Sequence, residues 1–211
     1  MNLPFNKSCR ACPRLARHLA GVRREHCDYH ARPVAPFGDA RARLLIVGLA
    51  PGMHGANRTG RPFTGDHAGI LLYQMLHRHG FANQPNGADP RDGLRLIDCR
   101  ITNAVKCLPP ENKPLPEEVV RCNRYLRAEL ERLPAGAVVL ALGAIAHGAV
   151  LRAHDLKLAS FPFGHGKEYL LPRDLALFDS YHCSRYNTQT RRLTPRMFST
   201  VVRRVRARLS R

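Results

Sequence analysis

Four short apolar runs, separated by segments with helical periodicity, most constrain the fold of this 211-residue chain. The runs are residues 43–50 (RLLIVGLA), 96–107 (LIDCRITNAVKC), 137–143 (AVVLALG) and 175–182 (LALFDSYH). Runs of this length and composition are typical of buried strands. Strands that alternate with helices form mostly parallel sheets covered by helices on both faces. The sequence therefore predicts the α/β class, as a three-layer α/β/α fold with a central, mostly parallel four-stranded sheet.

The segments between these runs supply the helices of that fold. Helical patterns cover residues 66–80, 116–133, 144–154 and 194–211, and a short helix is expected around 13–20. Proline and two glutamates open the second segment, and a Thr-Pro pair opens the last one, as is common at helix N-termini. The chain contains no internal repeat or low-complexity tract, and its length suits one domain with a sizeable core. We expect a single domain over residues 1–211.

The charge balance indicates a polyanionic partner. Lysine and arginine number 34 against 16 acidic residues, which gives a formal net charge of +18. Self-repulsion on this scale favours nucleic acid as the partner over a merely soluble basic surface. The basic residues are spread along the chain, which disfavours membrane-surface binding. No apolar stretch reaches ~18 residues and the N-terminus lacks the apolar core of a signal peptide, so we expect a cytoplasmic protein without membrane association. We also expect a monomer.

Seven cysteines form the second compositional signal. Cys9 and Cys12 make a C-x-x-C pair, Cys107 ends the second apolar run, and Cys122 follows in the next helix. Because disulfides are unusual in the cytosol, these four thiols predict either a zinc site or a [4Fe–4S] cluster. In the alternative, Cys107 and Cys122 are buried apolar residues. The other cysteines have no companion at ligand spacing: Cys27, Cys99 and Cys183.

Three polar loops follow three of the expected strands, at residues 48–66, 103–113 and 182–193. In open α/β sheets, functional residues collect beyond the carboxyl ends of the strands. The first loop, GLAPGMHGANRTGRPFTGD, is rich in glycine but contains neither a P-loop nor a dinucleotide-binding fingerprint. The loops are therefore expected to converge on a site of another kind.

Four segments resemble the motifs of the iron–sulfur uracil-DNA glycosylases, the type B group (family 5) in particular. They are GLAPGMHGANRTGRPFTGD, TNAVKCLPP, ENKP and SYHCSRYNTQTRRLT. The resemblance implies an α/β/α glycosylase fold with an N-terminal cluster-binding segment. It implies a [4Fe–4S] cluster on Cys9, Cys12, Cys107 and Cys122. It also implies a DNA repair enzyme, a monofunctional glycosylase that hydrolyses the N-glycosidic bond of uracil, or of other deaminated bases such as hypoxanthine, and leaves an abasic site.

Some positions depart from the pattern of these relatives. The related type A group carries a glutamate where this chain has Leu49, so Asp66 is the only carboxylate of the first loop. Cys183 follows His182 where relatives usually carry proline or valine, and Arg191 replaces a common glycine. Asn103 resembles the type A group instead, which favours a preference for uracil.

Asp66 and His182 are the expected catalytic residues. Asp66 would orient or deprotonate water and offset the positive charge that develops on the sugar. His182 would donate a hydrogen bond to the uracil O2 as negative charge develops there, and a neutral imidazole suffices for that role. In the alternative interpretation, Asp66 is simply the N-cap of the helix that follows it.

Substrate-binding residues are expected in the first two loops. A glycosylase must flip its base out of the duplex and hold it in a pocket. Phe63 would stack on the flipped base, although an ordinary core phenylalanine is the alternative. Asn103 would pair with the Watson–Crick edge, although a strand-end asparagine is commonly a turn residue. Asn112 is a weaker candidate for the pocket. Backbone N–H groups around Gly48 to Gly52 would donate hydrogen bonds to the uracil O2, the same oxygen that His182 would contact.

The third loop is expected to bind DNA beside the damaged base, entering the minor groove. Its candidate residues are Ser184, Arg185, Tyr186, Asn187 and Gln189. Arg58 and Arg61 would contact phosphates. The other histidines, including His54, His67, His77, His147 and His165, are expected at surface or packing positions. A non-catalytic iron–sulfur nucleic-acid-binding protein is the alternative function, against which the presence of both Asp66 and His182 argues.

Overall fold

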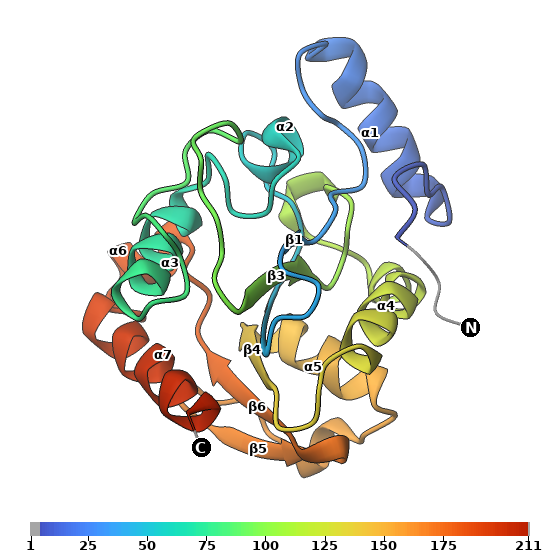
Figure 1. The fold of residues 1–211 in the computed structure, drawn as a ribbon. Helices are drawn as coiled ribbons and strands as arrows, with labels where there is room; N and C mark the ends of the chain where they lie inside the picture. Colours follow the sequence, from blue (N-terminus) through green and yellow to red (C-terminus); the bar gives the residue numbers. More distant parts are fainter. Residues whose placement is uncertain (1–4, 211) are drawn as a thin grey trace.

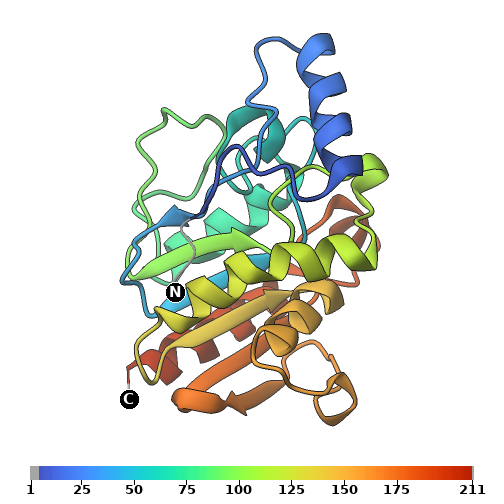
Figure 2. The ribbon, with the colours of Figure 1, turned by 90° about the vertical axis from the view of Figure 1, so that its right-hand side faces the viewer.

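A computed structural model describes residues 5–210 as one mixed sheet between two layers of helices (Figures 1 and 2). The strand order is β1-β3-β2-β4-β6-β5. Its four central strands are parallel and coincide with the four apolar runs: β3 (Cys99–Asn103), β2 (Leu44–Gly48), β4 (Val138–Leu142) and β6 (Leu175–Ser180). The α/β/α prediction is confirmed, but the described sheet has six strands rather than four.

The two additional strands are antiparallel edges, β1 (Phe37–Gly38) and β5 (Glu168–Leu171). β1 is only two residues long, and β5 leaves Leu170 66% exposed. Neither segment therefore carries the apolar run by which a buried strand can be identified in a sequence. A tight turn at Pro172–Asp174 joins β5 to β6, with Arg173 and Asp174 both at positive φ.

Alternate residues of the central strands face two separate helix layers, as the two-residue period of a strand requires. Leu44 and Ile46 of β2 pack with α3 (His67–Arg78) and α7 (Pro195–Leu209). Leu45 and Val47 pack with α4 (Pro116–Glu131) and α5 (Ala144–Ala153). Both faces of the sheet are thus buried, which explains the continuous apolar runs.

A further helix, α1 (Pro13–Glu25), lies outside this sandwich beside α2 (Figure 1). It is five residues longer at its C-terminus than the sequence predicts. Two short helices, α2 (Ala56–Thr59) and α6 (Arg185–Gln189), lie within the first and third polar loops. Single turns of 3₁₀ helix occur at Pro110–Asn112 and Leu158–Ser160. No helix within residues 5–210 is long and apolar enough to cross a membrane.

The register of the parallel strands brings the polar loops to one edge of the sheet. Gly48 at the end of β2 lies beside Asn103 at the end of β3, and Leu142 of β4 lies beside Ser180 of β6. Residues 48–66, 103–113 and 182–193 therefore all leave the sheet at its carboxyl edge. This arrangement provides the convergence that the sequence predicts.

The third loop carries a local backbone strain. Arg191 has a φ of 56°, in the left-handed region that glycine adopts without steric cost. This is the position at which the resembling glycosylases commonly carry glycine. Arg191 therefore adopts a backbone conformation that is sterically unfavourable for a residue with a Cβ atom.

Candidate active site and cysteine site

The three loops enclose a cleft of about 520 Å³ at the carboxyl edge of the sheet. Predicted site residues from all three loops line it: Gly52, Phe63, Asp66, Asn103, Asn112, His182, Ser184 and Arg185. Leu49 also lines the cleft, so the position at which type A relatives carry glutamate faces the same space. The loops thus bring together a carboxylate, an imidazole and two amides.

Asp66 occupies the N-cap position of α3 without capping it. Its side chain makes no hydrogen bond to the first turn of that helix. The carboxylate instead accepts a 3.2 Å hydrogen bond from the backbone N–H of Ala56 in α2. Burial raises the pKa of Asp66, while the Ala56 N–H and the positive charge of Arg58 oppose that rise. The helix-cap alternative is therefore insufficient to explain this side chain, which faces the cleft.

Two glycines of the first loop make room for the Asp66 carboxylate. A Cβ atom at Gly55 would lie 1.8 Å from Asp66 Oδ1, and one at Gly52 would lie 2.8 Å from it. The first distance is far below van der Waals contact, so a side chain at Gly55 would displace the carboxylate. The glycine-rich composition of this loop is thus explained by close packing against an acid.

His182 follows β6 and faces the cleft beside Phe63. The two ring centroids lie 5.9 Å apart, with an angle of 30° between the ring planes. Burial lowers the pKa of His182 to about 4, so the imidazole is neutral near pH 7. The Asn187 amide in α6 donates a 2.9 Å hydrogen bond to the His182 backbone oxygen. This contact couples the position of His182 to the third loop.

Two further histidines support the end of β6. His147 Nδ1 lies 2.8 Å from the Asp179 carboxylate, and its Nε2 donates to the Phe161 carbonyl at 2.7 Å. His165 Nδ1 accepts a 3.2 Å hydrogen bond from the backbone N–H of Tyr181. Both histidines therefore have positions consistent with packing, as the sequence suggests, and they fix the backbone immediately before His182.

Gly48 lies behind the cleft rather than in its wall, which corrects its predicted place among the substrate-binding residues. It does not line the cleft, and its carbonyl is hydrogen bonded to the Ala104 N–H at 2.9 Å. A Cβ atom at Gly48 would lie 2.5 Å from Asn103 Oδ1 and 2.8 Å from the Phe63 ring. Gly48 thus acts from behind the cleft, by leaving space for the amide and the ring that line it. Phe63 is both a core residue and a cleft residue.

The third loop forms the rim of the cleft through α6. Ser184 caps this helix by accepting a hydrogen bond from the Asn187 N–H, and Tyr186 projects with 69% exposure. Arg185 and Gln189 are also exposed. His67 also lines the cleft, although the sequence does not single it out as a site residue. Its Nε2 atom lies 3.2 Å from the Thr188 hydroxyl oxygen. A histidine at the start of a helix carries no sequence signal that distinguishes this position from an ordinary surface one.

The two arginines predicted to contact phosphates have different environments. Arg58 is exposed on α2, where its side chain donates to the His54 carbonyl at 2.7 Å. Arg61 is buried, and its guanidinium donates to both carboxylate oxygens of Asp92 at 3.0 and 2.8 Å. The predicted phosphate contact of Arg61 is therefore inconsistent with its position, because an internal carboxylate already neutralises it.

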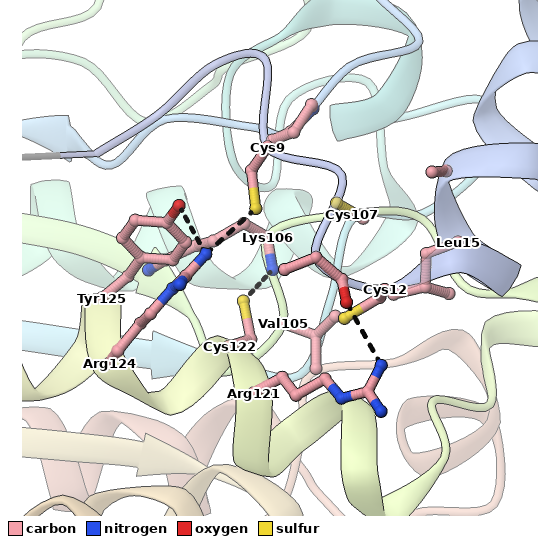
Figure 3. A pocket seen from close by; sticks show the side chains of 13 residues that line it. Cys9, Cys12, Leu15, Val105, Lys106, Cys107, Arg121, Cys122, Arg124 and Tyr125 are labelled. Atoms are coloured by element: carbon pink, nitrogen blue, oxygen red, sulfur yellow. Dashed lines mark hydrogen bonds between the residues drawn. The ribbon is translucent and has the colours of Figure 1, made fainter.

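The four cysteines of the predicted ligand set line one cavity beneath α1 (Figure 3). Cys12 is the N-cap residue of α1, Cys107 follows β3, and Cys122 lies in α4, so three separate parts of the fold supply them. The Lys106 backbone N–H donates to Cys122 Sγ at 3.3 Å, and Arg124 donates to Cys9 Sγ at 3.5 Å (Figure 3). N–H donors and a cation therefore already face the sulfur atoms.

The pKa values of these thiols are shifted in opposite directions around the cavity. Burial raises the pKa of Cys107 and Cys122. Burial also opposes ionisation of Cys9, but hydrogen bonds with Tyr125 and Arg124 bring its pKa below the usual range. Among residues 5–210, no three His, Cys, Asp or Glu side chains form a group that could hold a single metal ion. The remaining cysteines lie apart from the set, Cys27 being exposed, and Cys99 and Cys183 buried.

The chain is similar to known proteins along most of its length. The family model of the uracil DNA glycosylase superfamily matches residues 35–206. A type-5 uracil-DNA glycosylase of Thermus thermophilus is 49% identical over 200 residues, covering 92% of this chain and 91% of that protein. One from Pyrobaculum aerophilum is 42% identical over 204 residues, covering 95% and 88%. A type-4 uracil-DNA glycosylase of Archaeoglobus fulgidus is 34% identical over 163 residues, covering 75% and 73%.

The fold and the cleft define an α/β protein with an acid and a neutral imidazole at the carboxyl edge of a parallel sheet. The chain belongs to the uracil-DNA glycosylase superfamily. This membership confirms the family that the four sequence motifs indicate. The similarity to the type-5 proteins extends over more of the chain than that to the type-4 protein.

The packing of Asp66 against Gly55 predicts the effect of a single methyl group. Gly55→Ala places a Cβ atom where Asp66 Oδ1 lies and displaces the carboxylate. We expect glycosylase kcat/KM to fall by about 100-fold, the loss typical of a misplaced catalytic group. Gly21→Ala is the matched control, because nothing lies within 4 Å of a Cβ atom there. It should retain activity and gain about 0.5–1 kcal/mol of stability. Equal activity of both variants would contradict this role of Gly55.

Proposed function

We propose that the chain is a DNA repair enzyme that flips uracil out of DNA and hydrolyses its N-glycosidic bond, leaving an abasic site. The observation that carries this proposal is the presence of Asp66 and a neutral His182 in one cleft. Membership of the uracil-DNA glycosylase superfamily supplies the reaction class. Hypoxanthine and other deaminated bases are proposed as further substrates. A purely nucleic-acid-binding role is less consistent with this pair of residues.

In the proposed reaction, His182 acts on the leaving base. Cleavage of the glycosidic bond leaves negative charge on uracil, and an N–H donor at O2 stabilises that charge. A histidine that is neutral near pH 7 supplies such a donor without transferring a proton. Asn103, which lines the same cleft and is almost completely buried, would hold the Watson–Crick edge of the base through its amide. Phe63 would supply the stacking surface.

Asp66 acts on the sugar side of the same bond. Ionised, it would orient or deprotonate the attacking water and offset the positive charge on the sugar. The Ala56 N–H, at 3.2 Å, holds one oxygen of the carboxylate and leaves the other for water. Glutamate at the Leu49 position is absent here, so the water-activating role is assigned to Asp66 alone.

The third loop and α2 are proposed to hold the DNA around the flipped base. Tyr186 and Gln189 of α6 are exposed at the rim and would enter the minor groove. Arg185 lines the cleft and would contact the adjacent phosphate, as would the exposed Arg58 of α2. Asn187 has a different role, since its amide holds the His182 backbone.

Cys9, Cys12, Cys107 and Cys122 are proposed to ligate a [4Fe–4S] cluster. Four thiols from one cavity suit such a cluster, and the N–H donors that face Cys9 and Cys122 would stabilise its sulfur charge. The cluster would supply covalent links between the N-terminal segment, the β3 loop and α4. Because the cavity does not include the residues of the active-site cleft, its role is proposed to be structural.

The excision assay tests the proposed function. Duplex DNA carrying uracil opposite guanine is incubated with the protein and treated with alkali, which cleaves the strand at abasic sites. We expect strand scission with the wild type. Asp66→Asn should lower the single-turnover rate by about 10²–10⁴-fold, and His182→Ala by about 10²–10³-fold. DNA affinity should remain close to wild type in both variants. No scission by the wild type would refute the proposal.

The two catalytic residues predict the pH dependence of excision. Because burial raises the pKa of Asp66, the carboxylate is protonated, and activity lost, as the pH falls through that raised value. His182 stays neutral down to about pH 4 and contributes no inflection near its ordinary pKa of ~6.5. The acid limb of kcat/KM should therefore disappear from the residual activity of Asp66→Asn. An acid limb that persists in this variant would assign it to another group.

Cysteine variants test the cluster. Cys122→Ser should lower the iron content and the visible absorbance of protein purified without oxygen, and it should lower the melting temperature. Cys27→Ser is the matched control, because Cys27 is exposed and lies outside the cavity. Wild-type protein that contains zinc and no iron would exclude the cluster. Equal iron content in both variants would exclude Cys122 as a ligand.

A further inference from the structure

A basic groove lies along α1, formed by residues that do not line the active-site cleft. It runs between this helix, the segment that precedes it and the segment that follows, and has a volume of about 460 Å³. Among the described residues, no carboxylate lines it, whereas five cationic side chains do: Lys7, Arg10, Arg17, Arg23 and Arg32. All five are exposed to solvent.

These cations are not paired with carboxylates in the described part of the chain. Within residues 5–210, none of the five forms an ion pair with an aspartate or glutamate. Arg23 donates to the Ala31 carbonyl at 2.6 Å, a contact that leaves its charge uncompensated. Five like charges around one groove repel one another, and a polyanion bound there relieves that repulsion.

A second surface groove shows that this imbalance is local. That groove lies along α4 and α5 and is lined by Arg124, Arg127 and Arg152 together with Glu131 and Asp155. Arg127 pairs with Asp155 at 2.7 Å. Cations and carboxylates are thus mixed there, as on an ordinary solvated surface. The high net charge of the chain does not by itself account for the groove along α1.

The shape of the groove suits an extended polyanion. Ala16 and Ala20, one helical turn apart, line it and present no bulky side chain. Arg17 and Arg23 are separated by six residues of α1, which corresponds to about 9 Å along a helix axis. This distance is the axial rise of about two to three nucleotides of one DNA strand. A phosphate backbone that follows α1 can therefore contact both arginines through phosphates about two to three nucleotides apart.

The groove is connected to the active-site cleft through α2. The Ala31 and His30 N–H groups donate to the Asn57 and Arg58 carbonyls at 3.0 and 2.9 Å. The segment that ends in Arg32 is thus fixed to the helix that carries Arg58 and that forms one wall of the cleft. α1 and α2 lie side by side at the same end of the molecule (Figure 1).

We propose that the groove of Lys7, Arg10, Arg17, Arg23 and Arg32 binds the phosphate backbone of duplex DNA on one side of the flipped base. It forms a second anchor that extends the DNA-binding surface past α2 onto α1. The proposal rests on the proposed action on DNA, and it adds a contact that the cleft alone does not require.

Binding measurements on two duplex lengths test this anchor. One duplex, carrying a non-hydrolysable uracil analogue, covers only the cleft, and the other is extended by about two helical turns on either the 5′ or the 3′ side. For Arg17→Ala/Arg32→Ala, we expect weaker binding of the long duplex, with the slope of log K against log[salt] reduced by about 1.8, or ~0.9 per lost contact. The salt slope should be reduced for only one of the two long duplexes, either the one extended on the 5′ side or the one extended on the 3′ side. Binding of the short duplex should stay unchanged.

Arg127→Ala/Arg152→Ala is the matched control, because it removes the same charge from the charge-balanced groove. It should bind both duplexes with the wild-type salt slope. The anchor is refuted if the two double variants behave alike, or if Arg17→Ala/Arg32→Ala weakens the short duplex as much as the long one. Excision of uracil by the wild type on a short duplex, measured in parallel, separates a failure of this anchor from a failure of the proposed activity.

Discussion

The parallel register of β3, β2, β4 and β6 is the constraint on which the rest of the structure depends. It aligns Gly48 with Asn103 and Leu142 with Ser180, so the loops after β2, β3 and β6 leave the sheet at one edge. Both faces of the ladder are buried, and a shift by one residue would exchange the residues that face the two cores. Hydrophobic packing far from the cleft therefore sets which loop residues meet in it.

Within the cleft, burial has opposite effects on the two catalytic candidates, and both effects suit their proposed roles. It lowers the pKa of His182, so the imidazole is neutral, and it raises the pKa of Asp66, which increases its basicity. The fold tolerates a buried acid because Gly52 and Gly55 bring the backbone against it and the Ala56 N–H donates to it. The acid and the imidazole belong to different strand loops, so neither loop could form this site alone.

The sequence predicts those parts of the fold that depend on local pattern. Four apolar runs identify the parallel strands, whereas β1 is too short and β5 too exposed to be identified in the same way. Asp66 and His182 are predicted because each belongs to a motif of the resembling glycosylases, and each of these motifs forms a loop that follows a strand. Arg58 and Arg61 look alike in sequence, yet only Arg61 is buried and paired with a carboxylate. Its partner, Asp92, lies 31 residues further along the chain. Such non-local contacts have no local signature.

The central claim is that a neutral His182 stabilises the charge on the departing base, and its imidazole nitrogen shifts test that claim most directly. The ¹⁵N resonances of His182, assigned by comparison with His182→Ala, would be followed from about pH 8 to about pH 5 with a non-hydrolysable uracil duplex bound. The account predicts the pattern of a neutral imidazole, with one protonated nitrogen, over the whole range. Titration to the imidazolium near pH 6.5, or a charged imidazole at pH 8, would contradict it.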